Sequence, residues 1–219
     1  MGTLTRSLAN NITTGGVIAP AGITNATVAD ITSFPNASGG TLVLLSTQTA
    51  SASATISFTT GLDSTYDEYV FKFINIHPSV NEANLMVNFS TDNGSNYNVT
   101  KTTTRFYAYH GEDDASTLLG YLTGVDLAQS TADQEFIRGI GSDNDQAGVG
   151  TLQLFNPSST VFVKHFIGRS STAQASDYAE DDYLAGYCNT TSAVDAVRFQ
   201  MSSGNIDDGI IKLYGVKKS

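Results

Sequence analysis

The sequence has little charge for its length. Charged residues make up 15% of its 219 positions, against about 25% in an average globular domain. Lys and Glu, which usually cover the outer faces of helices, are scarce, while Thr, Ser and Asn are abundant. Hydrophobic residues still reach 40%, which is enough for a buried core. This composition predicts an all-β protein with a core, and neither a helical nor a disordered chain.

Three further absences exclude whole classes of protein. A single cysteine, Cys188, excludes a fold stapled by internal disulfides. No apolar run approaches the roughly 18 residues that span a bilayer, and residues 7–22 lack the continuous apolar core of a secretory signal. Basic residues are few: 11 of them against 21 acidic ones give a net charge of −10, which argues against general binding of nucleic acid.

The first 50 residues differ from the rest of the chain. Residues 1–60 contain two charged side chains, Arg6 and Asp30, and isolated aliphatic residues among Thr, Ala, Ser, Gly and Asn. Such a segment lacks the apolar density to fold alone, yet it carries too little charge for a solvated tail. We therefore predict an extended assembly arm over 1–50, which adds strands to neighbouring subunits or threads between them. A flexible leader is the alternative.

From residue 51 onward the pattern changes to short β-like runs separated by turn residues. Residues 69–76 carry aromatic side chains on one face and aliphatic ones on the other, which predicts a central strand that ends at His77-Pro78. Asn93-Gly94 supplies the positive φ of a tight turn, so we predict a hairpin between 85–89 and 99–109. The remaining candidate strands are 54–59, 136–140, 151–155, 161–167, 194–201 and 209–216, with a turn at 156–159 and a strand pair over 118–128.

About eight to ten short strands with turn residues between them suggest two packed antiparallel sheets. No convincing helix of three turns is present. We therefore predict an antiparallel two-sheet β-sandwich of jelly-roll type over 51–219, preceded by the arm over 1–50.

The three histidines are the first candidates for metal chemistry. His110 precedes the acidic run 112–114, and a strand-end histidine beside carboxylates could bind a divalent metal. A solvated acidic loop is the favoured interpretation. His165, inside a predicted strand, is expected to be buried and hydrogen-bonded, and His77 lies at a strand end. The triplet 143–145 resembles part of a calcium loop but lacks the downstream bidentate Glu. We predict no metal and no cofactor.

Acidic residues are concentrated in two loop-rich segments. Residues 111–147 hold eight acids and one base, Arg138, and residues 177–182 hold four more acids. Acidity in loops usually serves solubility, so we expect nearly neutral strands between them.

No motif for nucleophilic or metal-assisted catalysis is present. The sequence lacks a Gly-x-Ser-x-Gly elbow, a His-Glu-x-x-His pair, a phosphate-binding glycine loop and paired cysteines. We expect Cys188 to be a buried structural thiol. We predict no catalytic residue, although the two facing carboxylates of a glycosidase stay open.

Five tyrosines lie near predicted loops or strand ends: Tyr107, Tyr109, Tyr178, Tyr183 and Tyr187. Aromatic faces stack well on sugar rings, so these residues could form a platform that binds glycans. Packing in the core explains most tyrosines equally well, and both interpretations stay open.

Three parts of the chain resemble a known family. They are residues 61–69 running into 71–78, residues 156–159 and the run 211–216. Together they are similar to virion structural proteins of tailed bacteriophages, especially short-tailed phages of marine bacteria, over roughly residues 51–219. These segments are strands and turns rather than catalytic motifs, so the resemblance implies a role in the virion without identifying a site.

The resemblance implies a non-enzymatic bacteriophage virion structural protein, a capsid decoration or fibre-type appendage that docks through its N-terminal arm. A tail-associated receptor- or glycan-binding module is the alternative, and a polysaccharide-cleaving enzyme is a third. Expected partners are other virion proteins of capsid or tail and further copies of the chain. We expect a homotrimer, because appendages commonly form closed cyclic assemblies. A host surface glycan is the partner that the alternative implies. No nucleic acid and no membrane insertion are expected, and the location is the virion, after synthesis in the bacterial host cytoplasm.

Overall fold

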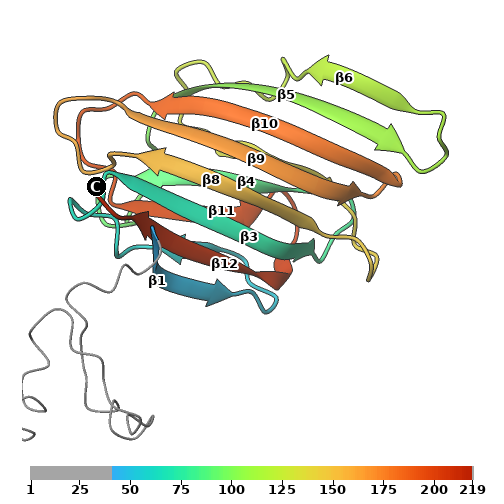
Figure 1. The fold of residues 1–219 in the computed structure, drawn as a ribbon, viewed down its shortest axis with the longest axis horizontal. Coiled ribbons are helices and arrows are strands. Elements are labelled where there is room, and N and C mark those ends of the chain that lie inside the picture. Colours follow the sequence, from blue (N-terminus) through green and yellow to red (C-terminus); the bar gives the residue numbers. More distant parts are fainter. Residues whose placement is uncertain (1–40, 219) are drawn as a thin grey trace, which may run out of the picture. The chain divides into compact units, whose positions relative to one another are not determined.

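The computed structural model describes residues 41–218. They fold into twelve antiparallel strands joined by turns and loops (Figure 1). These residues contain no helix. Eight strands form one large sheet, in the order β1 (Leu42–Thr49), β12 (Ile206–Val216), β3 (Glu68–Pro78), β8 (Gly148–Phe155), β9 (Lys164–Gln174), β10 (Tyr178–Cys188), β5 (Lys101–Gly111) and β6 (Thr117–Tyr121). The other four follow the order β7 (Gln134–Ile140), β4 (Ala83–Ser90), β11 (Ala196–Met201) and β2 (Ile56–Phe58).

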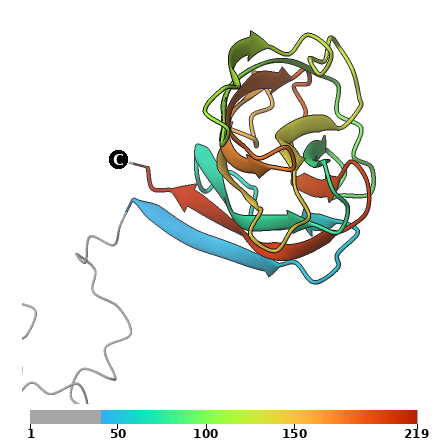
Figure 2. The same cartoon turned by 90° about the vertical axis from the view of Figure 1, so that its right-hand side faces the viewer.

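The sheet branches at β9. One residue pair, Ile140 with Gln174, joins β7 to β9 and leads on to β4, β11 and β2, while the other branch continues through β10, β5 and β6. The path from β1 to β2 curls until it nearly closes into a barrel (Figure 2). An isolated bridge between Ser53 and Ile206 links the segment before β2 to β12. The all-β antiparallel class is confirmed, and the jelly-roll sandwich stays a prediction.

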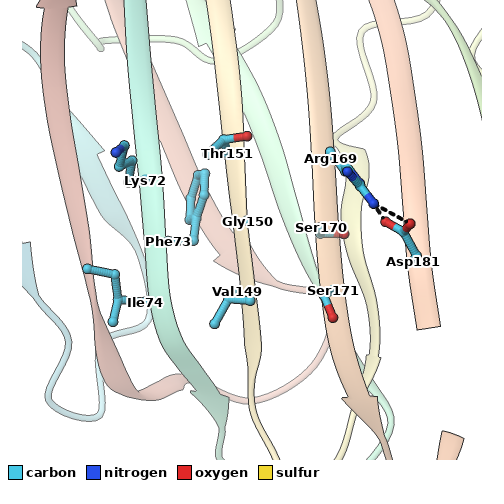
Figure 3. Close-up of a pocket in the computed structure, with 10 residues that line it drawn as sticks. All are labelled: Lys72, Phe73, Ile74, Val149, Gly150, Thr151, Arg169, Ser170, Ser171 and Asp181. Atoms are coloured by element: carbon cyan, nitrogen blue, oxygen red, sulfur yellow. Dashed lines mark hydrogen bonds and ion pairs between the residues drawn. The ribbon is translucent and has the colours of Figure 1, made fainter. Parts of the chain in front are cut away.

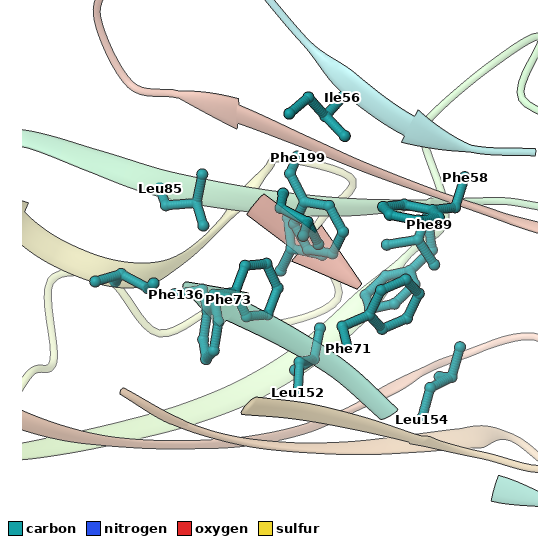
Figure 4. Packing of buried hydrophobic residues seen from close by; sticks show 14 of the residues in the cluster. Ile56, Phe58, Phe71, Phe73, Leu85, Phe89, Phe136, Leu152, Leu154 and Phe199 are labelled. Carbon is teal, nitrogen blue, oxygen red and sulfur yellow. The ribbon is translucent and has the colours of Figure 1, made fainter. Parts of the chain in front are cut away.

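A cluster of phenylalanines fills the interior between β3, β8 and β11 (Figure 4). The ring of Phe199 in β11 lies 5.3 Å from that of Phe71 and 4.9 Å from that of Phe73, and Phe73 lies 5.0 Å from Phe136. All four are buried, and full burial of one such side chain contributes roughly 1.5–3 kcal/mol. We call these residues, with Phe58, Phe89 and Phe166, the phenylalanine core.

Strand alternation in β3 explains how the phenylalanine core forms. Tyr69, Phe71 and Phe73 point inward, while Lys72 and Ile74 lie on the outer face. β12 and β8 flank β3, so the prediction of a central strand is confirmed. The predicted strands 54–59, 85–89, 136–140, 151–155, 194–201 and 209–216 also coincide with observed strands.

The hairpin predicted between 85–89 and 99–109 is wrong, although its turn is present. Asn93 and Gly94 have φ of 57° and 81°, the values that a tight turn needs. β4, however, pairs with β7 and β11, and β5 pairs with β10 and β6. After the turn the chain therefore crosses from one branch of the sheet to the other. The turn residues specify only a local reversal of the chain.

Other segments also differ from the prediction. Residues 117–121 form a single strand, β6, and no strand follows in 122–128, where a partner strand was expected. β9 begins at Lys164 and runs on to Gln174. β10 has no counterpart among the predicted strands. Within the predicted arm, β1 pairs with β12 of the same chain, and the rest of the arm, residues 1–40, lies outside the described residues.

Candidate functional site

The interior changes character under β9, β10 and β5. Strand alternation still turns every second residue inward, but the inward residues are now polar or charged. Asp182 of β10, for example, lies opposite Ser170 of β9 and Tyr107 of β5. The buried polar residues of these strands are Lys101, Thr103, Arg105, Lys164, Ser170, Thr172, Glu180 and Asp182.

Arg105 is the centre of a buried ionic cluster. Its Nε donates to Oδ1 of Asp182 at 3.1 Å, and its Nη2 lies 2.8 Å from the same oxygen. Its Nη1 donates to Oε1 of Glu135, whose other oxygen accepts a hydrogen bond from Asn84. The guanidinium has no exposed surface, so two carboxylates inside the protein must balance its charge. We call Arg105, Glu135, Arg138, Glu180 and Asp182 the ionic cluster.

Glu180 belongs to the ionic cluster but is held less firmly than Asp182. Its Oε2 accepts a hydrogen bond from Gln174 at 2.9 Å and lies 3.5 Å from Nη1 of Arg138. Its Oε1 and Oδ2 of Asp182 are buried and have no N–H or hydroxyl partner among the described residues, and the two carboxyl groups hydrogen-bond to each other when Glu180 keeps its proton. Burial, and after it the Asp182 carboxylate, raises the pKa of Glu180 to about 7. Glu180 therefore keeps its proton in a range where an ordinary Glu is ionised.

The pKa values of the other two carboxyl groups of the ionic cluster are also raised. Burial raises the pKa of Asp182 and that of Glu135, and the charge of Arg105 opposes both effects.

A pocket opens where β7 and β10 diverge from β9, and Glu180 is one of its walls. We call it the fork pocket, and its volume is about 450 Å³, within the range of ligand sites. Five strands and the adjoining turns contribute the residues around it: Glu82, Asn84, Tyr107, Tyr109, Arg138, Gly139, Gln174, Ser176, Tyr178 and Glu180.

Three tyrosines form one wall of the fork pocket. The ring of Tyr109 stacks on that of Tyr178, with centroids 4.7 Å apart and planes within 8°, and on that of Tyr107 at 6.0 Å. The guanidinium carbon of Arg138 lies 5.1 Å from the centre of the Tyr107 ring, which is a cation–π contact. An aromatic wall and a cation thus meet beside the Glu180 carboxyl.

Three of the five tyrosines predicted as a platform therefore meet in one place. Tyr183 lies instead on the outer face of the sheet, where it stacks on Phe106 at 4.8 Å, and Tyr187 lies near His165. The prediction did not include Arg138, Gln174 or Asn84. Because β10 was not predicted as a strand, the two-residue spacing of Tyr178 and Glu180 did not indicate that both side chains face the same pocket.

The histidines do not gather at a metal site. His165 is exposed, so its predicted burial is wrong, because strand alternation in β9 turns it outward. His110 is exposed, with Nε2 3.3 Å from Asp114, and Nε2 of His77 lies 3.2 Å from the backbone oxygen of Asp143. Within residues 41–218, no group of three or more His, Cys, Asp or Glu could hold a metal ion.

Both acidic segments contain parts of strands, since the first includes β7 with the buried Glu135 of the ionic cluster. In the first, Asp113 accepts hydrogen bonds from the backbone N–H groups of Ala115 and Ser116, which is ordinary turn chemistry. The second is not a loop, because Glu180 and Asp182 lie inside β10 and are buried. The prediction of nearly neutral strands is therefore wrong.

Cys188 is buried, as predicted. It lies in register between Lys101 of β5 and Lys164 of β9. Burial raises the pKa of its thiol to about 12 although both lysines oppose this. Lys101 donates to Asn88 at 2.8 Å, and Lys164 donates to the backbone oxygen of Phe162 at 3.0 Å. This arrangement keeps the thiol protonated and unreactive.

A second depression, of about 500 Å³, lies on the outer face of the large sheet (Figure 3). Lys72, Thr151 and Arg169 stand along it. Two hydrogen bonds, of 2.9 and 2.8 Å, tie Arg169 to Asp181. None of the residues around it has an unpartnered buried polar atom, so the fork pocket is the better candidate for a ligand site.

No family model matches the chain, and no curated protein and no solved structure was found to match it. The resemblance to phage virion proteins therefore stays a prediction. Among the described residues there is no helix long and apolar enough to cross a membrane.

Proposed function

We propose that this chain is a non-enzymatic bacteriophage virion structural protein, a capsid decoration or fibre-type appendage that docks through its N-terminal arm. The phage origin rests on the resemblance of 61–78, 156–159 and 211–216 to such proteins. The observation that supports docking is the free edge of β6, which is suited to accept a strand from a neighbouring subunit.

β6 is the last strand of its branch, and its second edge has no partner in residues 41–218. Two backbone hydrogen bonds fix the pattern of the β5–β6 ladder: Gly111 donates to Ser116, and Leu122 donates to Arg105. Hydrogen-bonded and non-hydrogen-bonded pairs alternate along an antiparallel ladder. The N–H groups that point away from β5 are therefore those of Thr117, Leu119 and Tyr121.

The side chains of β6 do not protect this edge. Leu119 is 74% exposed and Tyr121 is 56% exposed, and the strand contains no charged residue and no proline. Edge strands usually carry lysine, proline or a bulge that prevents pairing with another chain. An apolar edge without these features favours a strand that is paired in an assembly.

Residues 1–40 are the donor that we propose. Their only charged side chains are Arg6 and Asp30, so a strand from this segment adds little charge next to Leu119. In a closed homotrimer each copy would donate one arm and accept another, and other capsid or tail proteins could accept it in the same way. We propose that this assembly takes place in the virion, after synthesis in the host cytoplasm.

We propose that the sheet of eight strands and the group of four strands correspond to the two sheets of a jelly-roll-type sandwich. The phenylalanine core supports this assignment, because its rings come from β3 and β9 of the large sheet and from β2, β4, β7 and β11 of the other group.

Sedimentation of the full chain tests the docking proposal. We expect a trimer, and we expect deletion of residues 1–40 to give a monomer with unchanged β-type circular dichroism. Leu119→Lys places a charge on the proposed edge and should weaken assembly at least tenfold. Val161→Lys is the matched control, because Val161 is also well exposed but lies outside β6. A monomeric full chain, or a trimer that survives the deletion, would overturn the proposal.

A receptor- or glycan-binding module associated with the tail is a second candidate, and the fork pocket is the observation that favours it. Of the buried carboxyl groups in the ionic cluster, only Glu180 lines this pocket, while Arg105 holds Asp182 and Glu135. Glu82 also lines the pocket. Because a glycosidase needs two carboxyl groups at its site, an assay for reducing ends released from polysaccharides tests the proposal that the protein is not an enzyme. We expect no release of reducing ends. Hydrolysis that is lost in Glu180→Gln would overturn this part of the proposal.

A further inference from the structure

We propose that the fork pocket binds an acidic sugar, a pyranose ring that carries a carboxylate, and that Arg138 holds this carboxylate. The inference rests on the second candidate function and names its ligand class. It does not depend on assembly through β6, so the two proposals can fail separately.

Arg138 has more hydrogen-bonding capacity than the protein uses. Its side chain is 34% exposed, and its one hydrogen bond to the described residues is the 3.5 Å contact with Glu180. A guanidinium offers five N–H donors in a planar fork that fits the two oxygens of a carboxylate. The Tyr107 ring beneath it limits its movement. Arg138 therefore presents an oriented cation to whatever enters the pocket.

Glu180 makes only a long contact with Arg138, whose charge also acts on the Asp182 and Glu135 carboxyl groups. Its Oε2 already accepts a hydrogen bond from Gln174, and its carboxyl group is protonated over part of the neutral range. In that form Glu180 contributes no charge to the contact with Arg138. The charged or titratable groups around Glu180 on the surrounding strands and turns are Asp182, Arg105, Glu135, Arg138, Tyr107, Tyr109, Tyr178 and Glu82. With Glu180 protonated, two arginines face two carboxylates in the ionic cluster, so a ligand carboxylate would be held by the unused N–H donors of Arg138 and not by an excess of positive charge.

The rest of the pocket fits a sugar better than an apolar acid. No aliphatic side chain lines the pocket. The tyrosine wall offers ring surface against the C–H groups of a pyranose. Asn84, Gln174 and Ser176 supply amide and hydroxyl groups for the hydroxyl groups of a sugar. The volume of about 450 Å³ suits a small ligand of one or two rings.

Calorimetric or NMR titration of the full chain at pH 6 tests this inference. The probes are D-glucuronate and D-galacturonate, with D-glucose and D-galactose as neutral counterparts and acetate as a carboxylate without a ring. We expect a uronate to bind at least tenfold more tightly than its neutral counterpart and than acetate. If no uronate binds, or if glucose binds as tightly as glucuronate, the inference is overturned. If acetate binds as tightly, the assignment of a sugar is overturned.

Two variants separate the role of Arg138 from a general effect of charge. Arg138→Gln should lower uronate affinity at least tenfold. Arg169→Gln is the matched control, because Arg169 also lies over a tyrosine ring and pairs with a carboxylate, but on the outer face of the sheet. The control should leave affinity unchanged. Equal loss in both variants, or no loss in Arg138→Gln, would contradict the assignment of Arg138.

The dependence on pH gives a second readout. Raising the pH from 6 to 8 removes the proton from Glu180, which then neutralises Arg138 and repels the ligand carboxylate. We expect uronate affinity to fall at least threefold over this range in the unmodified chain and to stay constant in Glu180→Gln. An affinity that does not change with pH in the unmodified chain would overturn the part of the inference that concerns Glu180.

Discussion

The phenylalanine core and the ionic cluster occupy equivalent positions, because both lie on the inward faces of strands that belong to one branched sheet. In the phenylalanine core, rings from β3, β7 and β11 pack edge to face at centroid distances near 5 Å. In the ionic cluster, two arginines and three carboxyl groups fill the corresponding space under β5, β9 and β10. The two regions therefore differ in chemistry, and all their residues except the partly exposed Arg138 are buried.

The difference shows which region supplies stability. Apolar burial stabilises the folded state at any pH. Burial of charges incurs a desolvation penalty that ion pairs offset only when their geometry is good, and well-packed apolar residues would often do as well. Burial raises the pKa values of Glu180, Asp182 and Glu135 in spite of the two arginines, which means that the ion pairs offset the desolvation penalty incompletely here. We infer that the ionic cluster is retained for the fork pocket, which it borders.

Removal of Arg105 should have the largest effect, and it should depend on pH. Arg105→Met leaves Asp182 and Glu135 buried without their cation, which should cost about 3–5 kcal/mol of unfolding free energy at pH 8. The cost should be smaller at pH 5, where protons neutralise the carboxylates. Urea unfolding at both pH values measures it. Arg169→Met, at an exposed ion pair, should cost less than about 1 kcal/mol. Equal costs for Arg105→Met at pH 5 and pH 8 would contradict the comparison.

A matching change in the phenylalanine core should be similar in size and independent of pH. Phe199→Ala removes a ring that contacts Phe58, Phe71 and Phe73, and it should cost about 3–5 kcal/mol. The same urea experiment measures it at pH 5 and pH 8. Phe106→Ala, on the outer face, loses mainly its stacking on Tyr183 and should cost about 1 kcal/mol. If the loss in Phe199→Ala varies with pH, the two regions are coupled.

The unmodified chain should lose stability as the pH rises from about 4.5 to about 7. In this window the folded state keeps the proton on Glu180, whose pKa is raised to about 7, while the unfolded state has released it. The folded state thus binds more protons, so the unfolding free energy falls with pH, by at most about 3 kcal/mol. Glu180→Gln should flatten the profile. A rise in stability across this window would contradict the account.

A substitution at the boundary between the phenylalanine core and the ionic cluster should lower the unfolding free energy by a smaller amount. Gly168 of β9 lies against Phe136, and an added Cβ would come within 2.6 Å of the ring. Gly168→Ala should therefore cost about 1–3 kcal/mol through overpacking. Gly124→Ala is the control, since an added Cβ there meets no atom within 4 Å. If thermal unfolding shows equal stability for the two variants, the packing at this boundary is looser than described.

Sequence patterns identified the strands of the apolar region and also β5, but they missed β10 for a clear physical reason. Alternation of apolar and polar residues marks a strand only when its buried face is apolar. β3 and β11 meet that condition. In β10, Glu180 and Asp182 occupy the buried face while Ala179 lies exposed, so the pattern is inverted and resembles a solvated acidic loop.

The candidate site was predictable only in part. Tyr107 and Tyr109 are two residues apart, which places them on one face of any strand. Their aromatic rings indicated a possible surface for binding sugars. Arg138 and Glu180 gave no comparable signal, because they come from strands far apart in the sequence that meet only where the sheet branches. The turn at Asn93-Gly94 illustrates the same limit, because local chemistry set its φ angles while long-range packing chose the strand partners.

The protonation state of Glu180 distinguishes an ionic cluster that serves the fork pocket from one that only stabilises the fold. Carbon-detected NMR of the full chain with ¹³C-labelled glutamate carboxyl groups, assigned by loss of one signal in Glu180→Gln, follows this group from pH 3 to pH 9. We expect a titration midpoint near pH 7 for Glu180. A midpoint near 4.5, the value of an unperturbed Glu, would contradict it.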